Sequence, residues 1–194
     1  MKLIAATNNK NKIREFKEIL APLGFEILSM SETGFESDPE ETGTTFEENA
    51  VIKAQALAKL AAMPVLADDS GLEVDALGGA PGVYSARYAS GSDLDRINKL
   101  LENMKGKTDR NAQFTSCVAV CFPSGKIITA TGICRGTIAE KPAGNGGFGY
   151  DPIFYVEQFR RTYAELTPDE KNSMSHRGNA LKLLREKLEK ENLT

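Results

Sequence analysis

Two neighbouring carboxylates, Asp68 and Asp69, directly follow a short apolar run at residues 65–67. Such a run predicts a buried strand that delivers both carboxylates to its carboxyl end, and Ser70 and Gly71 then predict a tight turn. Adjacent carboxylates repel each other unless a cation or hydrogen bonds offset their charge. A magnesium ion that bridges carboxylate and phosphate oxygens would do so, whereas an acidic cap or turn is the alternative for the pair taken alone.

A polar segment joins the first apolar run, residues 2–6, to a stretch in which apolar residues recur at helical spacing. This segment consists of Thr7, Asn8, Asn9, Lys10, Asn11 and Lys12. Backbone amides at a helix N-terminus, together with nearby lysines, favour a bound phosphate. The segment is not a Walker A loop, because it contains no glycine and lacks the lysine-serine ending. It predicts a phosphate-binding loop, with a solvated polar turn as the alternative.

Glycine and aromatic residues gather at residues 141–150, where four glycines and two aromatic side chains occur. Glycine lets the backbone approach a flat ligand closely, and an aromatic ring can stack on a base. This stretch ends in Phe148, Gly149 and Tyr150, and Asp151 follows directly. The single histidine, His176, lies beside Arg177, with Lys171 shortly before them. Their hydrogen-bond donors suit a base carbonyl and a phosphate.

Taken together, these four clusters indicate a metal-dependent nucleotide site. The net charge of −3 argues against a dedicated binder of nucleic acid polymers, which would carry a basic excess. It leaves room for a small anionic ligand, because local lysines and arginines can bind one on an acidic protein.

The composition, 41% hydrophobic and 26% charged over 194 residues, is ordinary for a globular protein and suits a single domain spanning residues 1–194. Cys117, Cys121 and Cys134 have no metal-type spacing and are interpreted as reduced core cysteines. The apolar part of the N-terminus is too short for a signal peptide, and no run could span a bilayer. The expected location is the cytoplasm, with no membrane partner.

Periodicity and capping signals predict the elements that must position these residues. Strands are expected at residues 2–6, 25–29, 65–67, 112–122 and 126–140, with a hairpin turn at residues 123–125. Helices are expected at residues 13–23, at 46–62 behind a Thr45–Glu48 capping box, from Ser92 to Met104, from Pro168, and at 178–191. Residues 31–45 and 78–87 are expected as loops. Strands and helices that alternate early, followed by a hairpin, predict an α/β fold with a mixed sheet.

The motifs, in this order along the chain, resemble those of the inosine triphosphate pyrophosphatase family. The resemblance runs from about residue 3 to about residue 188. Asn8 departs from the pattern, because bacterial relatives often have glycine there. The matching segments are Thr7 to Lys12, Glu40-Glu41-Thr42-Gly43-Thr44-Thr45-Phe46, Ala67-Asp68-Asp69-Ser70-Gly71-Leu72, Gly78-Gly79-Ala80-Pro81-Gly82, Phe148-Gly149-Tyr150-Asp151-Pro152 and Ser175-His176-Arg177.

This resemblance implies an elongated α/β fold with a central mixed sheet flanked by helices, a cleft between two lobes, and a homodimer. It also implies magnesium-dependent hydrolysis of non-standard purine nucleoside triphosphates, namely ITP, dITP, XTP and dXTP. The products would be the nucleoside monophosphate and pyrophosphate, and the activity would cleanse the nucleotide pool.

The resemblance also assigns roles to residues. Asp69 would be the proton acceptor and a metal ligand. Because a bound metal ion would lower the basicity of Asp69, Asp68 is an alternative base on chemical grounds. Glu40 is favoured over its neighbour Glu41 as the second metal ligand. Ser70 and the loop from Thr7 to Lys12 would contact the substrate and its phosphates. The base and sugar would be held by Phe148, Gly149, Tyr150, Asp151, Lys171, His176 and Arg177.

Two other functions are compatible with parts of the sequence. One is a pyrophosphatase that acts on pyrimidine or modified nucleotides, against which the Ser175-His176-Arg177 motif argues. The other is a nucleotide sensor without catalysis, which would not need both the acidic pair and the basic loop.

Overall fold

The fold is that of a computed structural model, which describes residues 1–193. The strands are β1 (Lys2–Ala5), β2 (Glu26–Ser29), β3 (Val65–Val74), β4 (Asn111–Cys121), β5 (Ile127–Ile138), β6 (Phe154–Val156) and β7 (Arg161–Thr162). The α-helices are α1 (Lys10–Leu20), α2 (Met30–Thr33), α3 (Phe46–Ala58), α4 (Asp93–Asn103), α5 (Pro168–Met174) and α6 (His176–Lys190). Short 3₁₀ turns are η1 (Ala21–Leu23), η2 (Asp75–Leu77), η3 (Gly82–Arg87), η4 (Asp151–Ile153) and η5 (Tyr163–Glu165).

The strands of the described residues form one mixed sheet with the order β2-β1-β3-β4-β5-β6-β7. β1 pairs in parallel with both β2 and β3, whereas β6 pairs antiparallel with β5 and β7. Parallel neighbours require crossover connections, and α1 and then α2 with α3 supply them. The predicted α/β fold with a mixed sheet and flanking helices is confirmed.

The chain divides into two compact units. Unit 1 comprises Met1–Asp69, Ser116–Gly132 and the segment from Arg177, and unit 2 comprises Ser70–Thr115 and Ile133–His176. β3, β4 and β5 each contribute residues to both units. The single domain over residues 1–194 and the cleft between two lobes stay predictions.

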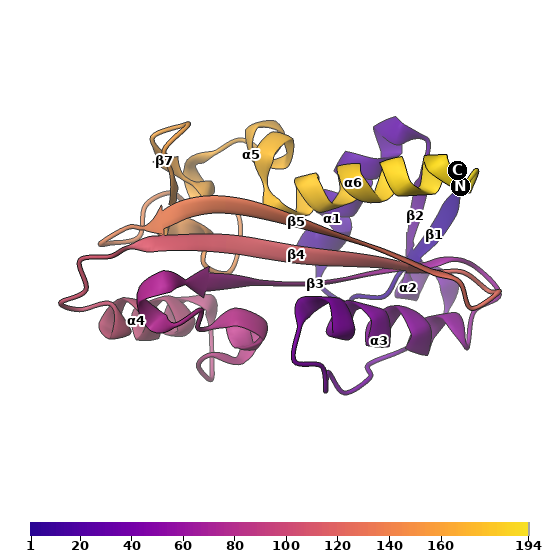
Figure 1. Ribbon diagram of the computed structural model, residues 1–194, viewed down its shortest axis with the longest axis horizontal. Helices are drawn as coiled ribbons and strands as arrows, with labels where there is room; N and C mark the ends of the chain where they lie inside the picture. Colours follow the sequence, from indigo (N-terminus) through magenta and orange to yellow (C-terminus); the bar gives the residue numbers. More distant parts are fainter. Residues whose placement is uncertain (194) are drawn as a thin grey trace. The chain divides into compact units, whose positions relative to one another are not determined.

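In unit 1, α1 and α6 cover one face of the sheet and α3 covers the other (Figure 1). Helical spacing of apolar residues causes this packing: Leu181, Leu184 and Leu188 of α6 are buried against the sheet, beside Phe16 and Leu20 of α1. α3 presents small residues to its own face of the sheet, since Ala50 and Ala54 are fully buried.

In unit 2, aromatic rings form the centre of the core. Phe114 of β4 lies edge-on to Phe154 of β6, with ring centroids 4.7 Å apart, and stacks on Tyr163 at 5.7 Å. α4 closes this core with Ile97 and Leu100, which are buried at the spacing that the sequence predicts.

The main correction concerns β3. The sequence predicts that it ends at residue 67 and that Ser70 and Gly71 form a turn, but the strand continues to Val74. Leu72 and Val74 are fully buried and keep the strand in the core. The two aspartates do not end the strand, because each finds cationic partners on its own face of the sheet, as described below.

Other boundaries differ by smaller amounts. The predicted loop at residues 31–45 begins with the short helix α2, which Ser29 caps with a capping box, and the loop at 78–87 contains η3. α3 ends at Ala58 rather than near residue 62, and α6 begins at His176, two residues earlier than expected.

Several expectations are confirmed. The turn at residues 123–125 joins the neighbouring strands β4 and β5, and the backbone of Gly125 donates to Phe122 at 2.9 Å. The three cysteines are free and buried, and burial raises the pKa of each thiol. Within residues 1–193, no helix has the length and apolar character that crossing a membrane requires.

The capping box of α3 generates a first prediction. The Thr45 hydroxyl accepts the amide of Glu48 at 3.2 Å, and the Glu48 carboxylate accepts the amide of Thr45 at 3.1 Å. Replacing Thr45 with alanine should lower the free energy of unfolding by about 1 kcal/mol, measured by urea denaturation. Thr45→Ser keeps the hydroxyl and should retain most of that stability; equal losses in both variants would contradict a role for the cap.

Candidate active site

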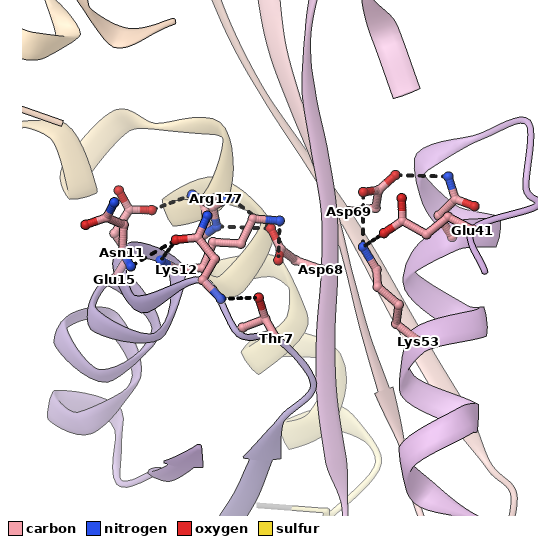
Figure 2. A network of polar contacts seen from close by, with 11 residues as sticks. Thr7, Asn11, Lys12, Glu15, Glu41, Lys53, Asp68, Asp69 and Arg177 are labelled. Carbon is pink, nitrogen blue, oxygen red and sulfur yellow. Dashed lines mark hydrogen bonds and ion pairs between the residues drawn. The ribbon is translucent and has the colours of Figure 1, made fainter. Parts of the chain in front are cut away.

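Asp68 and Asp69 point to opposite faces of the sheet (Figure 2). They are consecutive residues in the middle of β3, and successive side chains of a strand alternate between its faces. The sequence-based expectation of one paired acidic site at the end of a strand is therefore wrong in its geometry. The two carboxylates belong to two separate clusters, which both lie in unit 1.

The Asp68 cluster consists of Lys12, Glu15, Asp68 and Arg177. Asp68 is only 1% exposed, and its carboxylate lies 2.9 Å from the Lys12 ammonium and 2.8 Å from the Arg177 guanidinium. Arg177 also donates to Glu15, which is buried on α1. The cluster thus ties α1, β3 and α6 together through two cations and two carboxylates.

The charges in this cluster fix the protonation of Asp68. Burial by itself would raise the pKa of the carboxyl group, but Lys12, Arg177 and Lys53 outweigh it and hold that pKa well below its usual range. Burial also opposes the charge of Arg177, yet Asp68 and Glu15 raise the pKa of its guanidinium. A carboxylate with so little affinity for a proton is a poor general base. The burial of this carboxylate and its contacts with Lys12 and Arg177 therefore disfavour Asp68 as the alternative base.

The Asp69 cluster consists of Glu41, Asn49, Lys53 and Asp69. The Lys53 ammonium lies 3.1 Å from Asp69 and 2.7 Å from Glu41, so that the two carboxylates share one cation. The Asn49 amide donates to the other oxygen of Asp69 at 3.2 Å. Asn49 and Lys53 are four residues apart on α3, which places both on one side of the helix, and both contact Asp69 of β3.

The loop that carries Glu41 is held closely against α3. The Gly43 amide donates to the side-chain oxygen of Asn49 at 2.8 Å, which also fixes the orientation of the Asn49 amide. A Cβ atom at Gly43 would lie 2.6 Å from both Asn49 and Glu48, so a side chain does not fit there. Glycine at this position lets the loop bring Glu41 to the cluster.

The environment of Asp69 makes it a better base than an ordinary aspartate. Burial raises the pKa of Asp69, and Glu41 adds to this effect, while Lys53 and Lys12 oppose it without cancelling it. For Lys53, burial acts to lower the pKa, but Asp69, Asp68 and Glu41 together raise it, so the ammonium stays charged. A buried carboxylate with a raised pKa beside a cation is the kind of group that accepts a proton in catalysis.

The donor set of the Asp69 cluster fits a magnesium ion. Two carboxylates already hold one cation, the Lys53 ammonium, and Mg²⁺ is commonly bound by one or two carboxylates together with substrate phosphates. Among the residues that the structure describes, no group of three or more His, Cys, Asp or Glu side chains could hold a metal ion. The geometry favours Glu41 over the predicted Glu40 as the second ligand, since Glu40 is exposed on the loop before it.

The predicted phosphate loop leads into the N-terminus of α1. Asn9 caps this helix: its side-chain oxygen accepts the amides of Asn11 at 3.0 Å and Lys12 at 3.3 Å. The Thr7 hydroxyl accepts the amide of Asn9 at 3.1 Å. Asn8, Asn9 and Lys10 are exposed, whereas the Lys12 side chain turns inward to Asp68, and burial lowers its pKa.

Unit 2 brings together most residues that were predicted to hold the base. The Asp151 carboxylate accepts the Lys171 ammonium at 2.7 Å and the Phe148 amide at 2.9 Å. The Lys171 ammonium lies 4.8 Å from the centre of the Phe148 ring. Tyr150 is buried, and its hydroxyl donates to the Ser85 carbonyl at 2.9 Å.

His176 belongs to the aromatic core of unit 2 that contains Phe114 and Tyr163. Its ring stacks on Phe114, with centroids 4.7 Å apart and an angle of 13° between the planes, and the residue is only 4% exposed. The Ser175 amide donates to the Lys171 carbonyl at 2.8 Å, which ends α5 directly before His176. Ser70, the other predicted contact in unit 2, is half-buried within β3.

Sequence reasoning missed several residues that contact the predicted site residues. Among them are Glu15, Asn49, Lys53, Asp93, Ser85 and Phe114. Glu15 offered a signal, because it lies three residues after Lys12 and hence on the same face of the predicted helix. Asn49 and Lys53 lie within a helix that was predicted, but periodicity alone does not say which strand residues that helix faces. Asp93, which accepts the Gly149 amide at 2.6 Å, is separated from it by 56 residues.

Comparisons with known proteins show similarity along nearly the whole chain. The model of the Ham1 family matches residues 3–187. A Bacillus subtilis protein named dITP/XTP pyrophosphatase is 53% identical over 190 residues, which cover 96% of each chain. The solved structure of the Staphylococcus aureus Ham1 protein has a TM-score of 0.87 and 45% identity, covering 98% of this chain and 100% of that one. A dITP/XTP pyrophosphatase structure from Mycobacterium abscessus has a TM-score of 0.75 and 41% identity, covering 95% and 97%.

The opposite pKa shifts of the two aspartates generate the next prediction. Asp68→Asn removes a counterion that is buried with Lys12 and Arg177, so the free energy of unfolding should fall on the order of 3–5 kcal/mol near pH 7. Asp69→Asn removes a charge that burial disfavours, so its effect should stay within about 1 kcal/mol. Urea denaturation of both variants measures the difference.

The pH dependence provides the control. The folded-state pKa of Asp68 lies below its unfolded value, so its stabilisation is present above about pH 4 and is lost as the pH falls through the folded pKa. The gap between wild type and Asp68→Asn should therefore narrow in acid. A gap that stays constant down to acid unfolding would contradict the assignment.

Proposed function

Since the chain belongs to the Ham1 family, we propose that it hydrolyses ITP, dITP, XTP and dXTP to the monophosphate and pyrophosphate. Relatives at about half identity over nearly the whole chain carry the name dITP/XTP pyrophosphatase. The observation that carries the proposal is the Asp69 cluster, in which a carboxylate of raised pKa and a second carboxylate surround one cation. This is the arrangement that a base beside a metal-bound triphosphate requires.

The chemical step needs offset charge and an aligned water. A triphosphate carries about four negative charges near pH 7, and these repel an attacking oxygen until cations offset them. The capped N-terminus of α1 and the exposed ammonium of Lys10 would hold the phosphates. Lys12 would add its charge from the edge of the Asp68 cluster, where its side chain remains 16% exposed.

Asp69 would accept the proton of the water that attacks the α-phosphorus, and pyrophosphate would leave. Its oxygens are fixed by Asn49 and Lys53, so that the carboxylate keeps one orientation. Magnesium, when bound by Asp69 and Glu41, would supply acidity to its water and charge to offset the phosphates.

The base would be read by residues of unit 2. The Phe148 ring would stack on the purine, and Lys171 and His176 offer donors for the 6-carbonyl of hypoxanthine or xanthine, where adenine presents an amino group. Arg177 was predicted to join them, but its guanidinium is bound by Asp68 and Glu15. We therefore propose that Arg177 acts on the base through the position of its neighbour His176.

Two further properties stay proposals: a homodimer, which the resemblance implies, and a cytoplasmic location, which is the expectation from the sequence. We propose no nucleic acid polymer as a partner, and the net charge of −3 supports this.

Pyrophosphate release tests the function directly. We expect magnesium-dependent release from ITP, dITP and XTP far above GTP, ATP and dTTP, measured at equal concentrations with and without the metal. Asp69→Asn, which is expected to fold, is the matched control and should lose about 10²–10⁴-fold in rate. Preference for dTTP would move the protein to a pyrimidine class, and binding without release in the wild type would leave a sensor.

The histidine tests base selection. His176→Phe keeps a flat ring against Phe114 but removes the ring nitrogens, so discrimination between ITP and ATP should fall roughly tenfold to hundredfold. Steady-state kcat/KM for both substrates measures this ratio, and a thermal midpoint close to wild type controls for folding. An equal loss of kcat/KM for ITP and ATP would contradict a role of His176 in base recognition.

A further inference from the structure

We propose that Asp93 is a positioning residue, which ties down the loop Phe148–Asp151 so that the Phe148 ring is presented to the purine. The carboxylate of Asp93 accepts the backbone amide of Gly149 at 2.6 Å across 56 residues of sequence. This inference rests on the proposed function for the identity of the ligand. The tie itself is a property of unit 2, which contains both residues.

The loop needs such a contact because glycine, which is frequent in and before it, provides no side chain that could stabilise one conformation. Gly149 has a φ of 62°, in the left-handed region that favours glycine. Because it has no side chain, neighbouring residues can form hydrogen bonds only with its backbone. The preceding glycines, Gly144, Gly146 and Gly147, are exposed. Glycine loses more conformational freedom on ordering than any other residue, so a loop of this composition stays in one conformation only where specific contacts fix it.

The contacts of the loop divide into two kinds. Asp151 and Tyr150 hold its C-terminal end, through Lys171 and through the Ser85 carbonyl. Asp93 instead holds the middle of the loop, at the residue that directly follows Phe148. The Asp151 carboxylate also accepts the Phe148 amide at 2.9 Å, and Asp93 accepts the next amide, that of Gly149, so the two aspartates fix the peptide groups on both sides of Phe148 and thereby its ring.

Asp93 is itself held in a fixed orientation. One carboxylate oxygen accepts the guanidinium of Arg96, one turn along α4, while the other accepts Gly149. Arg96 also donates to the Gly91 carbonyl at 3.3 Å, which anchors its side chain beside the helix N-terminus. An ionised acceptor makes a hydrogen bond roughly twice as strong as a neutral one, so the charge of Asp93 suits the task.

Asp93 is not part of the capping box at the start of α4. That role belongs to Asp95, whose carboxylate accepts both the amide and the hydroxyl of Ser92 at 2.7 Å in a capping box. Two aspartates in the same first turn thus have different partners, one within the helix and one on the loop. Asp95 is a natural control for Asp93, because its removal disturbs α4 without touching the loop.

Kinetics of three variants test the proposal. Asp93→Ala should raise KM for ITP roughly tenfold to hundredfold, the range for loss of a hydrogen bond to a charged group, and leave kcat within about twofold. Asp93→Asn keeps an acceptor for Gly149 and should recover most of that loss. Asp95→Ala should lower the thermal midpoint but leave KM within about twofold. A rise in KM that Asp95→Ala matches would overturn the proposal, because helix stability would then explain both variants.

A second readout does not depend on turnover. The chain contains no tryptophan, so Phe148→Trp introduces a single fluorescent reporter on the loop. In that background, Asp93→Ala should increase quenching of the indole by acrylamide about twofold or more, and Asp95→Ala should not. Unchanged quenching in Phe148→Trp/Asp93→Ala would overturn the tie itself.

The two readouts separate the two hypotheses. If the wild type releases no pyrophosphate from any purine triphosphate while quenching responds to Asp93→Ala, the proposed function fails and the tie stands. If quenching responds and the wild type hydrolyses ITP, but KM is the same in Asp93→Ala, the loop is tied without serving the base, and the inference fails alone.

Discussion

The alternation of side chains along β3 is the constraint on which the site depends. Because Asp68 and Asp69 are neighbours, the strand sends one carboxylate toward α1 and α6 and the other toward α3. The sheet between them lets one residue be fully neutralised by buried cations while the next keeps a raised pKa. Two residues of the same type therefore differ in the pKa of their carboxyl groups, because they lie on opposite faces of the sheet.

The separation also divides the work of structure and chemistry. The Asp68 cluster is expensive to bury and is tolerable only because each charge has a partner of opposite sign. In return it locks the helix behind the phosphate loop to the helix that begins at His176. Asp69 is more exposed than Asp68, which would suit the proton exchange that we propose for it.

Local signals predicted the elements better than the site. The Thr45–Glu48 pattern indicated the start of α3, and Pro123–Gly125 indicated the turn between β4 and β5, because capping and turn chemistry act over a few residues. The end of β3 was misplaced because polar residues in a strand look like a boundary unless their partners are known. Those partners, such as Lys53 for Asp69 and Arg177 for Asp68, lie 16 and 109 residues away, and their pairing depends on how helices pack.

The position of Arg177 in the chain has a consequence for biosynthesis. The cation that pairs with both Asp68 and Glu15 comes from α6, and its partner Glu15 on α1 precedes it by 162 residues. Until that helix emerges, the nascent chain carries two carboxylates with no full complement of positive charge. Unit 1 can therefore acquire its native electrostatics only after α6 has been synthesised, so the synthesis of α6 and the assembly of the Asp68 cluster are coupled.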